Sequence, residues 1–348
     1  EGEKRALSNQ AYMAMQMIEQ GRIEEVRSQL ITNNEEALQR YMGNSAAGSI
    51  LFRDYGFCPF AGTRCEDGGP LIGKTQVRQP VAAGYLGMQN CLRCRHFVSG
   101  PVFIGGLLAI ANEISLQASI QFEHIAELAS SIKEMTKRID ELDVEHYLAV
   151  KAKRKFDESE RNWIEMKIRK TRSESESASK KADLYLCDIQ AVARLINQSQ
   201  ALLNEQASSG SDTNLPQLIV HTGHELDVAM EETSRFHQLH EVCENAEIYE
   251  SASAELALAP RSQLIDKMIA FNNMMPKMYA LDKKQQLVIG NQMTNFLLAR
   301  VKSWDKVDKL IEGKLLLQDL GDQECIAPTD IQAILAGRQP VALEASAL

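Results

Sequence analysis

The sequence predicts a mainly α-helical protein, with a long coiled-coil hairpin, a small cysteine-rich knob before it and a helical bundle after it. Three observations predict this fold class. There is no Gly or Pro between Leu107 and Ser209, and these are the residues that most strongly interrupt helices. Four of the seven cysteines lie between Cys58 and Cys94. Only 6% of the residues are aromatic, which is typical of a helical protein rather than a strand-rich one.

The overall composition limits the compartment and the function class. The 348 residues are enough for two or three domains, and the net charge of -9 argues against a protein that coats nucleic acid over its whole surface. No apolar run approaches the ~20 residues needed to cross a bilayer, and the charged start Glu1–Arg5 does not resemble a signal peptide. An odd number of cysteines does not indicate a secreted disulfide framework. We therefore expect a cytoplasmic protein without a membrane partner.

The N-terminal part is expected to change from helices to an irregular knob. Residues 1–43 have no Pro, and their apolar side chains recur at helical intervals, with Gly21 as the break between one or two helices. These apolar residues include Met15, Ile18, Ile23, Val26, Leu30 and Ile31. In residues 44–106 Gly and Pro become frequent and no helical period remains, so this segment is predicted to be the knob.

Residues 107–206 are predicted to form the hairpin. One stripe with alternating spacings of three and four is typical of coiled-coil a and d positions. It consists of Leu107, Ile110, Ile114, Ile125, Leu128, Ile132, Met135, Ile139 and Leu142. A second stripe contains Ile189, Val192, Ile196 and Leu203. An antiparallel hairpin with its turn within 143–160 would bury stripe against stripe, and a single very long helix is the alternative. The polar segment 171–181 is predicted to lack a buried seam.

A linker and a C-terminal helical domain are predicted to follow. Residues 207–222 are rich in Ser and Gly and contain Pro216, which is typical of a linker. Within the domain 223–348 we expect helices at 223–257, 261–275, 277–303 and 305–318, with Pro260 at the first position of its helix and Pro276 as a break. A last helix after Pro328, capped by Thr329 or Asp330, is expected to end at Gly337.

Four cysteines are the strongest candidates for a functional site. Cys58, Cys65, Cys91 and Cys94 have the spacing C-x6-C-x25-C-x2-C, which offers four thiolates from two loops to a tetrahedral Zn²⁺. Flanking cations at Arg64, Arg93 and Arg95 would favour deprotonated sulfurs. Four protein ligands leave no open position for water, so the expected zinc is structural. The alternatives are unrelated reduced thiols, an occasional disulfide, and a redox or iron–sulfur role; His96 is the reserve ligand.

Histidines and glycines offer weaker candidate sites. His221, His224, His237 and His240 suggest either a metal site or ordinary structural histidines, because no carboxylate or cysteine stands at ligand spacing. Gly105 and Gly106 lack the Lys-Ser/Thr ending of a phosphate loop, so they indicate close packing or a hinge, and no nucleotide is expected. No catalytic motif is visible, so whether the chain is an enzyme stays open.

A basic block in the middle of the chain is the candidate nucleic-acid contact. Its nine cations are Lys151, Lys153, Arg154, Lys155, Arg161, Lys167, Arg169, Lys170 and Arg172. Such a block is either the solvated face of a charged helix or a surface for the DNA backbone. Trp163 lies within it and would either stack on a base or pack inside the hairpin.

Residues 52–114 resemble a known family. They read Phe-Arg-Asp-Tyr-Gly-Phe-Cys-Pro, then Asn-Cys-Leu-Arg-Cys-Arg-His-Phe-Val-Ser-Gly-Pro, and end on Gly-Gly-Leu-Leu-Ala-Ile-Ala-Asn-Glu-Ile. This stretch resembles the C-terminal region of the large integrase-like, tyrosine-recombinase-associated proteins of bacterial gamma-mobile-trio mobile islands. The resemblance spans about the first 200 residues, and it implies DNA integration or recombination in a bacterial cytoplasm. The chain has no His-x-x-Arg, so no catalytic residue is carried over, and such an integrase would have its catalytic domain upstream of Glu1.

Two functional hypotheses follow. The first is an accessory, zinc-stabilised DNA-binding or assembly module of an integrase or recombinase from a mobile genetic element. Its partners would be DNA and, through the coiled coil, recombinase subunits or a second copy of the chain. The alternative is a non-catalytic coiled-coil scaffold for protein interaction without DNA contact.

Overall fold

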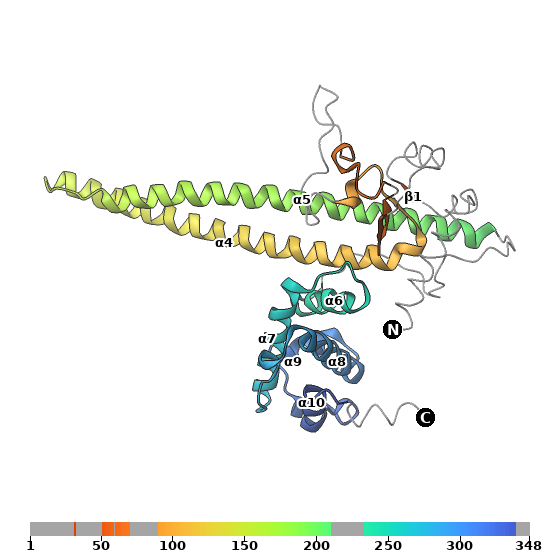
Figure 1. Cartoon of the computed structure of the whole chain (residues 1–348). Helices are drawn as coiled ribbons and strands as arrows, with labels where there is room; N and C mark the ends of the chain where they lie inside the picture. Colours follow the sequence, from red (N-terminus) through yellow and green to blue (C-terminus); the bar gives the residue numbers. More distant parts are fainter. Residues whose placement is uncertain (1–30, 33–50, 59, 70–89, 210–232, 339–348) are drawn as a thin grey trace.

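The structure is a computed structural model that describes residues 31–32, 51–58, 60–69, 90–209 and 233–338. Three parts are visible in Figure 1: a small sheet, a long pair of helices and a bundle of shorter helices. The mainly α-helical fold class predicted from the sequence is confirmed. The expected helices at 1–30, most of the linker 207–222 and the start of the domain 223–348 lie outside the described residues.

Two antiparallel helices form an arm. α4 spans Ile104–Lys151 and α5 spans Ser159–Ser209. The chain reverses at residues 152–158, inside the expected window, and the alternative of one very long helix is wrong. Lys153 has a φ of 53° in this turn. The register is held by Arg138–Glu160 at 2.9 Å, while His124 and Glu174 approach to 4.0 Å. We call the end near residues 143–172 the arm tip.

Apolar side chains fill the contact between the two arm helices at both ends. Near the start of α4 a cluster joins Leu107, Ile110 and Ile114 to Val192 and Ile196. At the tip a smaller cluster joins Leu142 to Ile164 and Ile168. These positions belong to the predicted stripes, except for Ile164 and Ile168, so the buried ends of the stripes explain the hairpin. The middle of the α4 stripe, from Ile125 to Ile139, is half-buried.

The middle of the arm corrects one prediction. Segment 171–181 was expected to have no buried seam, yet Thr171 and Ala178 within it are buried, and Ala182 directly after it is only 2% exposed. Small side chains allow two helix backbones to approach closely. Such a contact needs no periodic pattern of large apolar residues in the sequence. The neighbouring serines and lysines Ser173, Ser177, Lys180 and Lys181 are exposed.

The knob is built on a short antiparallel sheet with strand order β1-β4-β3-β2. The strands are β1 Ile31–Thr32, β2 Leu51–Arg53, β3 Gly56–Cys58 and β4 Val98–Ser99. The helix expected to reach Ile31 is wrong at this point, because Ile31 and Thr32 pair with Ser99 and Val98. This pairing occupies the edge of β4 that would otherwise leave its backbone groups open. The 3-10 turns are η1 Cys65–Asp67, η3 Cys91–Arg93 and η4 Pro101–Phe103.

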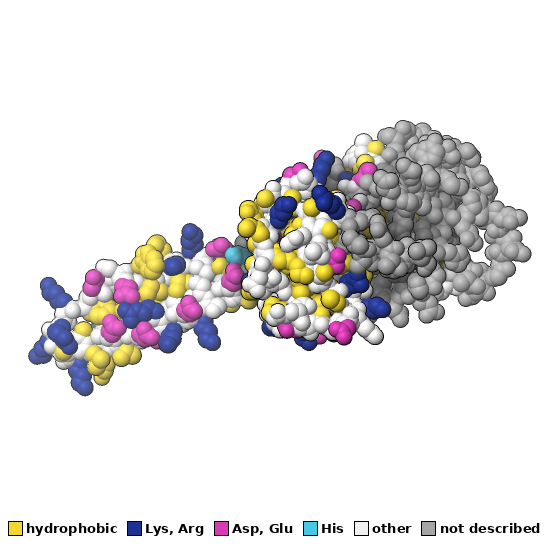
Figure 2. All heavy atoms as spheres, turned by 90° about the horizontal axis from the view of Figure 1, so that it is seen from below, with side chains coloured by type: hydrophobic (Ala, Val, Ile, Leu, Met, Phe, Trp, Pro, Cys, Tyr) yellow, Lys and Arg dark blue, Asp and Glu magenta, His cyan; other side chains and the backbone are white. Residues whose placement is uncertain are grey.

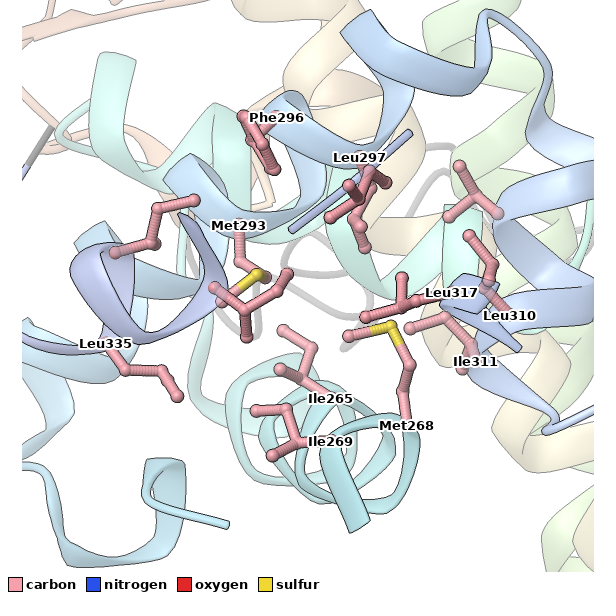
Figure 3. Close-up of a cluster of buried hydrophobic side chains, with 14 of the residues drawn as sticks. Ile265, Met268, Ile269, Met293, Phe296, Leu297, Leu310, Ile311, Leu317 and Leu335 are labelled. Carbon is pink, nitrogen blue, oxygen red and sulfur yellow. The ribbon is translucent and has the colours of Figure 1, made fainter. Parts of the chain in front are cut away.

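Five α-helices form the C-terminal bundle. They are α6 Arg235–Ile248, α7 Glu255–Phe271, α8 Lys283–Val301, α9 Trp304–Ile311 and α10 Pro328–Leu335, with short 3-10 turns η5 Met278–Ala280, η6 Leu317–Asp319 and η7 Asp322–Glu324. Figure 3 shows their core, where Ile265, Met268 and Ile269 of α7 face Met293 and Leu297 of α8. The predicted helices are therefore present, with different boundaries.

Local contacts explain the shifted boundaries. α7 starts at Glu255, so Pro260 lies inside the helix rather than at its first position. α8 starts later than expected because Asp282 and Gln285 form a capping box. α10 begins at Pro328 and has no side-chain cap, so the proposed caps Thr329 and Asp330 are wrong. Its end agrees with the sequence, since Gly337 has a φ of 70°.

The bundle docks on the first half of α4 (Figure 1). Leu116 packs with Leu239 and Val242 of α6 and with Leu258 of α7. Arg235 also forms a 2.7 Å ion pair with Glu123. Among the described residues, the segment Pro101–Lys151 is long and apolar enough to cross a membrane by length and composition alone. Its apolar window is 61% buried, and a packed core helix meets the same criterion.

Candidate metal site and basic arm tip

The structure brings the four predicted cysteines to one pocket. Cys58, Cys65, Cys91 and Cys94 all line it, together with His96. Cys58, Cys91 and Cys94 are buried, Cys65 is partly exposed, and no disulfide joins any of the four. Residues distant in the sequence thus line one pocket, and the zinc site itself stays a prediction.

Short turns position each thiol. Cys58 is the last residue of β3, and the turn after it includes Ala61 and Gly62 at φ values of 49° and 81°. Cys65 opens η1, and Cys91 opens η3, where the backbone N–H of Cys94 donates to the carbonyl of Cys91 at 3.0 Å. The N–H of His96 approaches the Cys94 Sγ at 3.4 Å. An N–H aimed at sulfur favours negative charge on that sulfur.

Burial dominates the electrostatics of the thiols. It raises the pKa of Cys91 to about 11 and that of Cys94 to about 12, and it also raises the pKa of Cys65. Negative charge on the neighbouring cysteines would raise the pKa values of Cys91 and Cys94 further, because the sulfurs lie in one pocket. Without a bound cation these three thiols keep their protons at neutral pH.

One of the expected cations, Arg64, lines the thiol pocket, and an unexpected one, Arg53, acts on Cys91. Arg53 lowers the pKa of Cys91 through its charge and a side-chain hydrogen bond. Arg93 instead pairs at 2.6 Å with Asp188 of α5, which also accepts a 2.6 Å hydrogen bond from Asn90. Arg64 lies over the Phe60 ring at 4.9 Å. Sequence reasoning missed Arg53 and Asp188 because both contacts join distant segments and no local spacing signals them.

The donor set suits zinc in its chemistry. Four cysteine thiolates are one of the usual ligand sets of a closed structural zinc site. His96 is buried and packs edge-on against Phe60, with ring centroids 5.1 Å apart. Among the described residues no group of three or more His, Cys, Asp or Glu side chains is arranged closely enough to hold a metal ion. The four sulfurs therefore share a pocket without forming a closed ligand set.

The described histidines of the bundle serve packing. His237 stacks on Trp304 with ring centroids 3.9 Å apart. It also contacts Glu241 at 3.3 Å, and His240 approaches Glu244 at 3.6 Å, so the expectation that no carboxylate stands near these histidines is wrong. His240 is buried beside Arg261, and burial lowers the pKa of His240 to about 4. Both side chains are thus occupied by neighbours in the bundle. His221 and His224 lie outside the described residues.

The nine predicted basic residues gather at the arm tip. Eight are exposed, and only Arg161 is half-buried, in a 2.8 Å ion pair with Asp143. Arg161 and Arg169 also pair with Glu165. Figure 2 shows dark-blue basic side chains around the free end of the arm. The basic block of the sequence therefore lies at the free end of the arm.

The turn itself carries cations without counterions. Lys151, Lys153, Arg154 and Lys155 form no ion pair with any residue that the structure describes. Three of the nearby carboxylates have other partners, since Arg138 pairs with Glu145 and Glu160, and Arg161 pairs with Asp143. Asp157 accepts hydrogen bonds from Ser159, and Glu158 forms no ion pair with a described residue. The four cations of the turn are therefore exposed to solvent beside two acidic side chains.

Comparisons with known proteins add no family. The chain has no significant match among protein-family models, curated proteins or solved structures. The cysteine pocket and the basic arm tip are therefore the features that carry a functional proposal.

Proposed function

We propose that this chain is an accessory, zinc-stabilised DNA-binding or assembly module of a DNA integrase or recombinase from a mobile genetic element, working in a bacterial cytoplasm. One observation carries the DNA contact. Four exposed cations, interrupted only by Ala152, form the arm turn and lack ion pairs with described residues. Phosphate groups are the anions that such a run neutralises with release of counterions. Integration as the process is supported by the resemblance of residues 52–114.

The other features fit a metal cross-link in the knob and an arm that holds the tip away from the bundle. A Zn²⁺ bound by Cys58, Cys65, Cys91 and Cys94 would tie β3 to the turn that leads into α4. The knob is joined to α5 by the Arg93–Asp188 pair, so the metal cross-link would fix the base of the arm. The arm would then hold the basic tip away from the bundle. Because the seam is filled by the two helices of the same chain, recombinase subunits or a second copy would pack on the outer surface of the coiled coil.

DNA binding is tested by charge reversal at the turn. The triple variant Lys153→Glu, Arg154→Glu and Lys155→Glu should lose most of its affinity for duplex DNA. Because each phosphate contact contributes about 0.9 to the slope of log affinity against log salt, the slope should fall by roughly three. Fluorescence anisotropy across a salt series measures both quantities.

A matched control carries the same charge change elsewhere on the arm. Lys133→Glu, Lys137→Glu and Lys180→Glu alter exposed lysines outside the tip and should leave most of the affinity intact. Equal losses in the two triple variants would show a general charge effect instead of a site. No binding by the wild-type chain at low salt would reject DNA contact and favour the protein-interaction scaffold.

Zinc is tested by metal analysis of the purified chain. We expect about one Zn²⁺ per chain, as four thiolates fill one tetrahedral site. The change Cys91→Ser with Cys94→Ser should abolish the metal and destabilise the knob, whereas Cys187→Ser, an exposed cysteine of α5, should do neither. Purified wild-type protein that contains no zinc and still unfolds cooperatively would reject the structural zinc. The same conclusion would follow if a chelator left the unfolding transition unchanged.

A further inference from the structure

The arm tip exposes large apolar side chains among its cations. Tyr147 is 66% exposed and Trp163 is 55% exposed. Val144, Leu148, Val150 and Met166 are also exposed hydrophobic residues of this region. Trp163 therefore does not pack inside the hairpin, which was one of its two expected roles. Figure 2 shows hydrophobic, basic and acidic side chains interleaved at the free end of the arm.

The two helices repeat the same arrangement. On α4, Val144, Tyr147, Leu148 and Lys151 follow the spacing i, i+3, i+4, i+7. On α5, Trp163, Met166, Lys167 and Lys170 follow it again. This spacing places each set along one side of its helix. Each helix thus presents an aromatic ring, apolar neighbours and a lysine together.

The two sets lie on the outer sides of the arm. Leu142 is buried in the seam, and Tyr147 follows five residues later, a turn of about 140° around the helix. On α5 the seam residues are Ile164 and Ile168, and Met166 lies midway between them on the opposite side. Because each set faces away from the partner helix, the apolar surfaces are on opposite faces of the tip.

The positions of these side chains distinguish between two possible ligands of the arm tip, a membrane surface and separated nucleic-acid strands. A helix that lies on a membrane presents one apolar face and keeps its opposite face polar. The tip instead has rings on both outer faces, and between them a turn whose cations form no ion pair with the part of the chain that the structure describes. Separated nucleic-acid strands offer the complementary chemistry, because unstacked bases bind aromatic rings while their phosphates bind Lys and Arg. Lys167 lies over the Trp163 ring at 5.0 Å, so a cation already accompanies the ring.

We propose that the arm tip binds nucleic acid with unpaired bases, entering between two separated strands as a wedge. Tyr147 and Trp163 stack on bases on the two sides, and Lys151, Lys153, Arg154 and Lys155 contact phosphates. This inference rests on the proposed DNA contact and specifies the structure of its substrate: a fork, bubble or junction in preference to an intact duplex.

The test compares a fully paired duplex with a duplex of equal length that contains a short unpaired bubble. Wild-type protein should bind the bubble more tightly. The double variant Tyr147→Ala and Trp163→Ala should lose about ten-fold or more in bubble affinity and keep its duplex affinity, since base–aromatic stacking is lost and the cations remain. Phe122→Ala, an exposed aromatic of α4 outside the tip, should leave both affinities unchanged.

Direct contact is read from tryptophan fluorescence. The chain has two tryptophans, Trp163 and Trp304, and Trp304→Phe leaves Trp163 as the reporter. Addition of bubble DNA should quench this emission more strongly than addition of the paired duplex. Circular dichroism of each variant confirms that the helices are retained.

The outcomes separate this inference from the proposed function. The wedge would be overturned if the chain bound bubble and duplex equally and the aromatic substitutions had no effect. A loss of DNA affinity on charge reversal would still support DNA contact in that case. Absence of binding to every DNA would reject both. The tip could instead bind phosphatidylserine vesicles through Tyr147 and Trp163. If neither the bubble nor the paired duplex competed with the vesicles, the tip would be assigned to an anionic membrane and the wedge would be overturned.

Discussion

At the scale of single residues, Glu113 links the arm to the bundle through a buried carboxyl group. Its side chain is 2% exposed within α4, and its Oε1 accepts a 3.1 Å hydrogen bond from the backbone N–H of Ser253. Burial raises the pKa of Glu113 to about 7, and the Ser253 bond opposes this rise. The protonation of one residue is thereby connected to the loop between α6 and α7.

The pH dependence follows from the direction of this shift. Between the ordinary pKa of a glutamate and about 7, the folded chain holds a proton that the unfolded chain has released. The contribution of Glu113 to stability is therefore present at low pH and lost as pH rises through this window. Glu113→Gln should remove that decline from the free energy of unfolding, measured by urea titration at several pH values.

The exposed residue Glu134 of the same helix provides the control. Glu134→Gln should leave the pH profile of the wild type unchanged. A Glu113→Gln chain that keeps the wild-type slope would show that Glu113 is not the source of the dependence.

At the scale of elements, the arm depends on side-chain size as much as on hydrophobicity. Large aliphatic residues fill both ends of the seam, whereas Thr171, Ala178 and Ala182 occupy its middle. The helices can remain in contact along the whole arm only if these middle positions stay small. The polar appearance of this segment in the sequence therefore conceals a packing constraint.

Enlarging the middle of the seam should separate the helices. Ala182→Leu inserts three carbons at a position that is 2% exposed, and overpacking of this kind costs about 1–3 kcal/mol. Thermal unfolding followed by circular dichroism measures the loss. Ala129→Leu makes the same change at an exposed position of α4 and should be nearly neutral. Equal stability of the two variants would contradict a tight seam at Ala182.

Elements with a local signal were predictable from the sequence, and elements set by distant partners were not. The arm helices and their turn follow from the lack of Gly and Pro and from the stripes ending at Leu142. β1 was missed because Ile31 and Thr32 become a strand only by pairing with β4. The seam at Ala178 was missed because small residues produce no hydrophobic period.

The same distinction applies to the candidate site. Cysteine spacing predicted a four-thiolate zinc site; the four thiols line one pocket, but among the described residues they form no group able to hold a metal, so the zinc stays a prediction. Arg53 and Asp188 were missed because the sheet and α5 bring them to the cysteine turns. The exposure of Trp163 also required the structure, since helical spacing alone permits either side of the seam.

At the scale of the whole molecule, all three parts meet where α4 begins. A Cβ at Gly106 would overlap the backbone carbonyl of Asp54 in the knob, and a Cβ at Gly105 would overlap the hydroxyl of Tyr249 in the bundle. Asp54 also accepts hydrogen bonds from the backbone and side chain of Ser251, at 2.8 and 2.7 Å. The two glycines thus serve close packing, which was one of the two roles expected for them.

Substitution of these glycines should have unequal effects. Gly106→Ala meets backbone atoms that cannot move alone, so we expect a loss of about 3 kcal/mol, at the upper end for overpacking. Gly105→Ala meets the flexible end of Tyr249, and a gain of about 1 kcal/mol in helix propensity offsets the displacement. Urea unfolding of both variants measures the difference. Equal losses would show that the Asp54 contact is not the limiting one.

The uninterrupted helices of the arm also set a distance. Beyond Glu123, where Arg235 makes the outermost described ion pair with the bundle, α4 continues to Lys151. At 1.5 Å per residue this is a reach of roughly 40 Å, equal to about twelve base pairs of DNA. Because two paired helices resist bending more than a single helix does, the arm would keep a fixed length. A partner held by the bundle and a strand opening held by the tip would then be kept at a fixed separation.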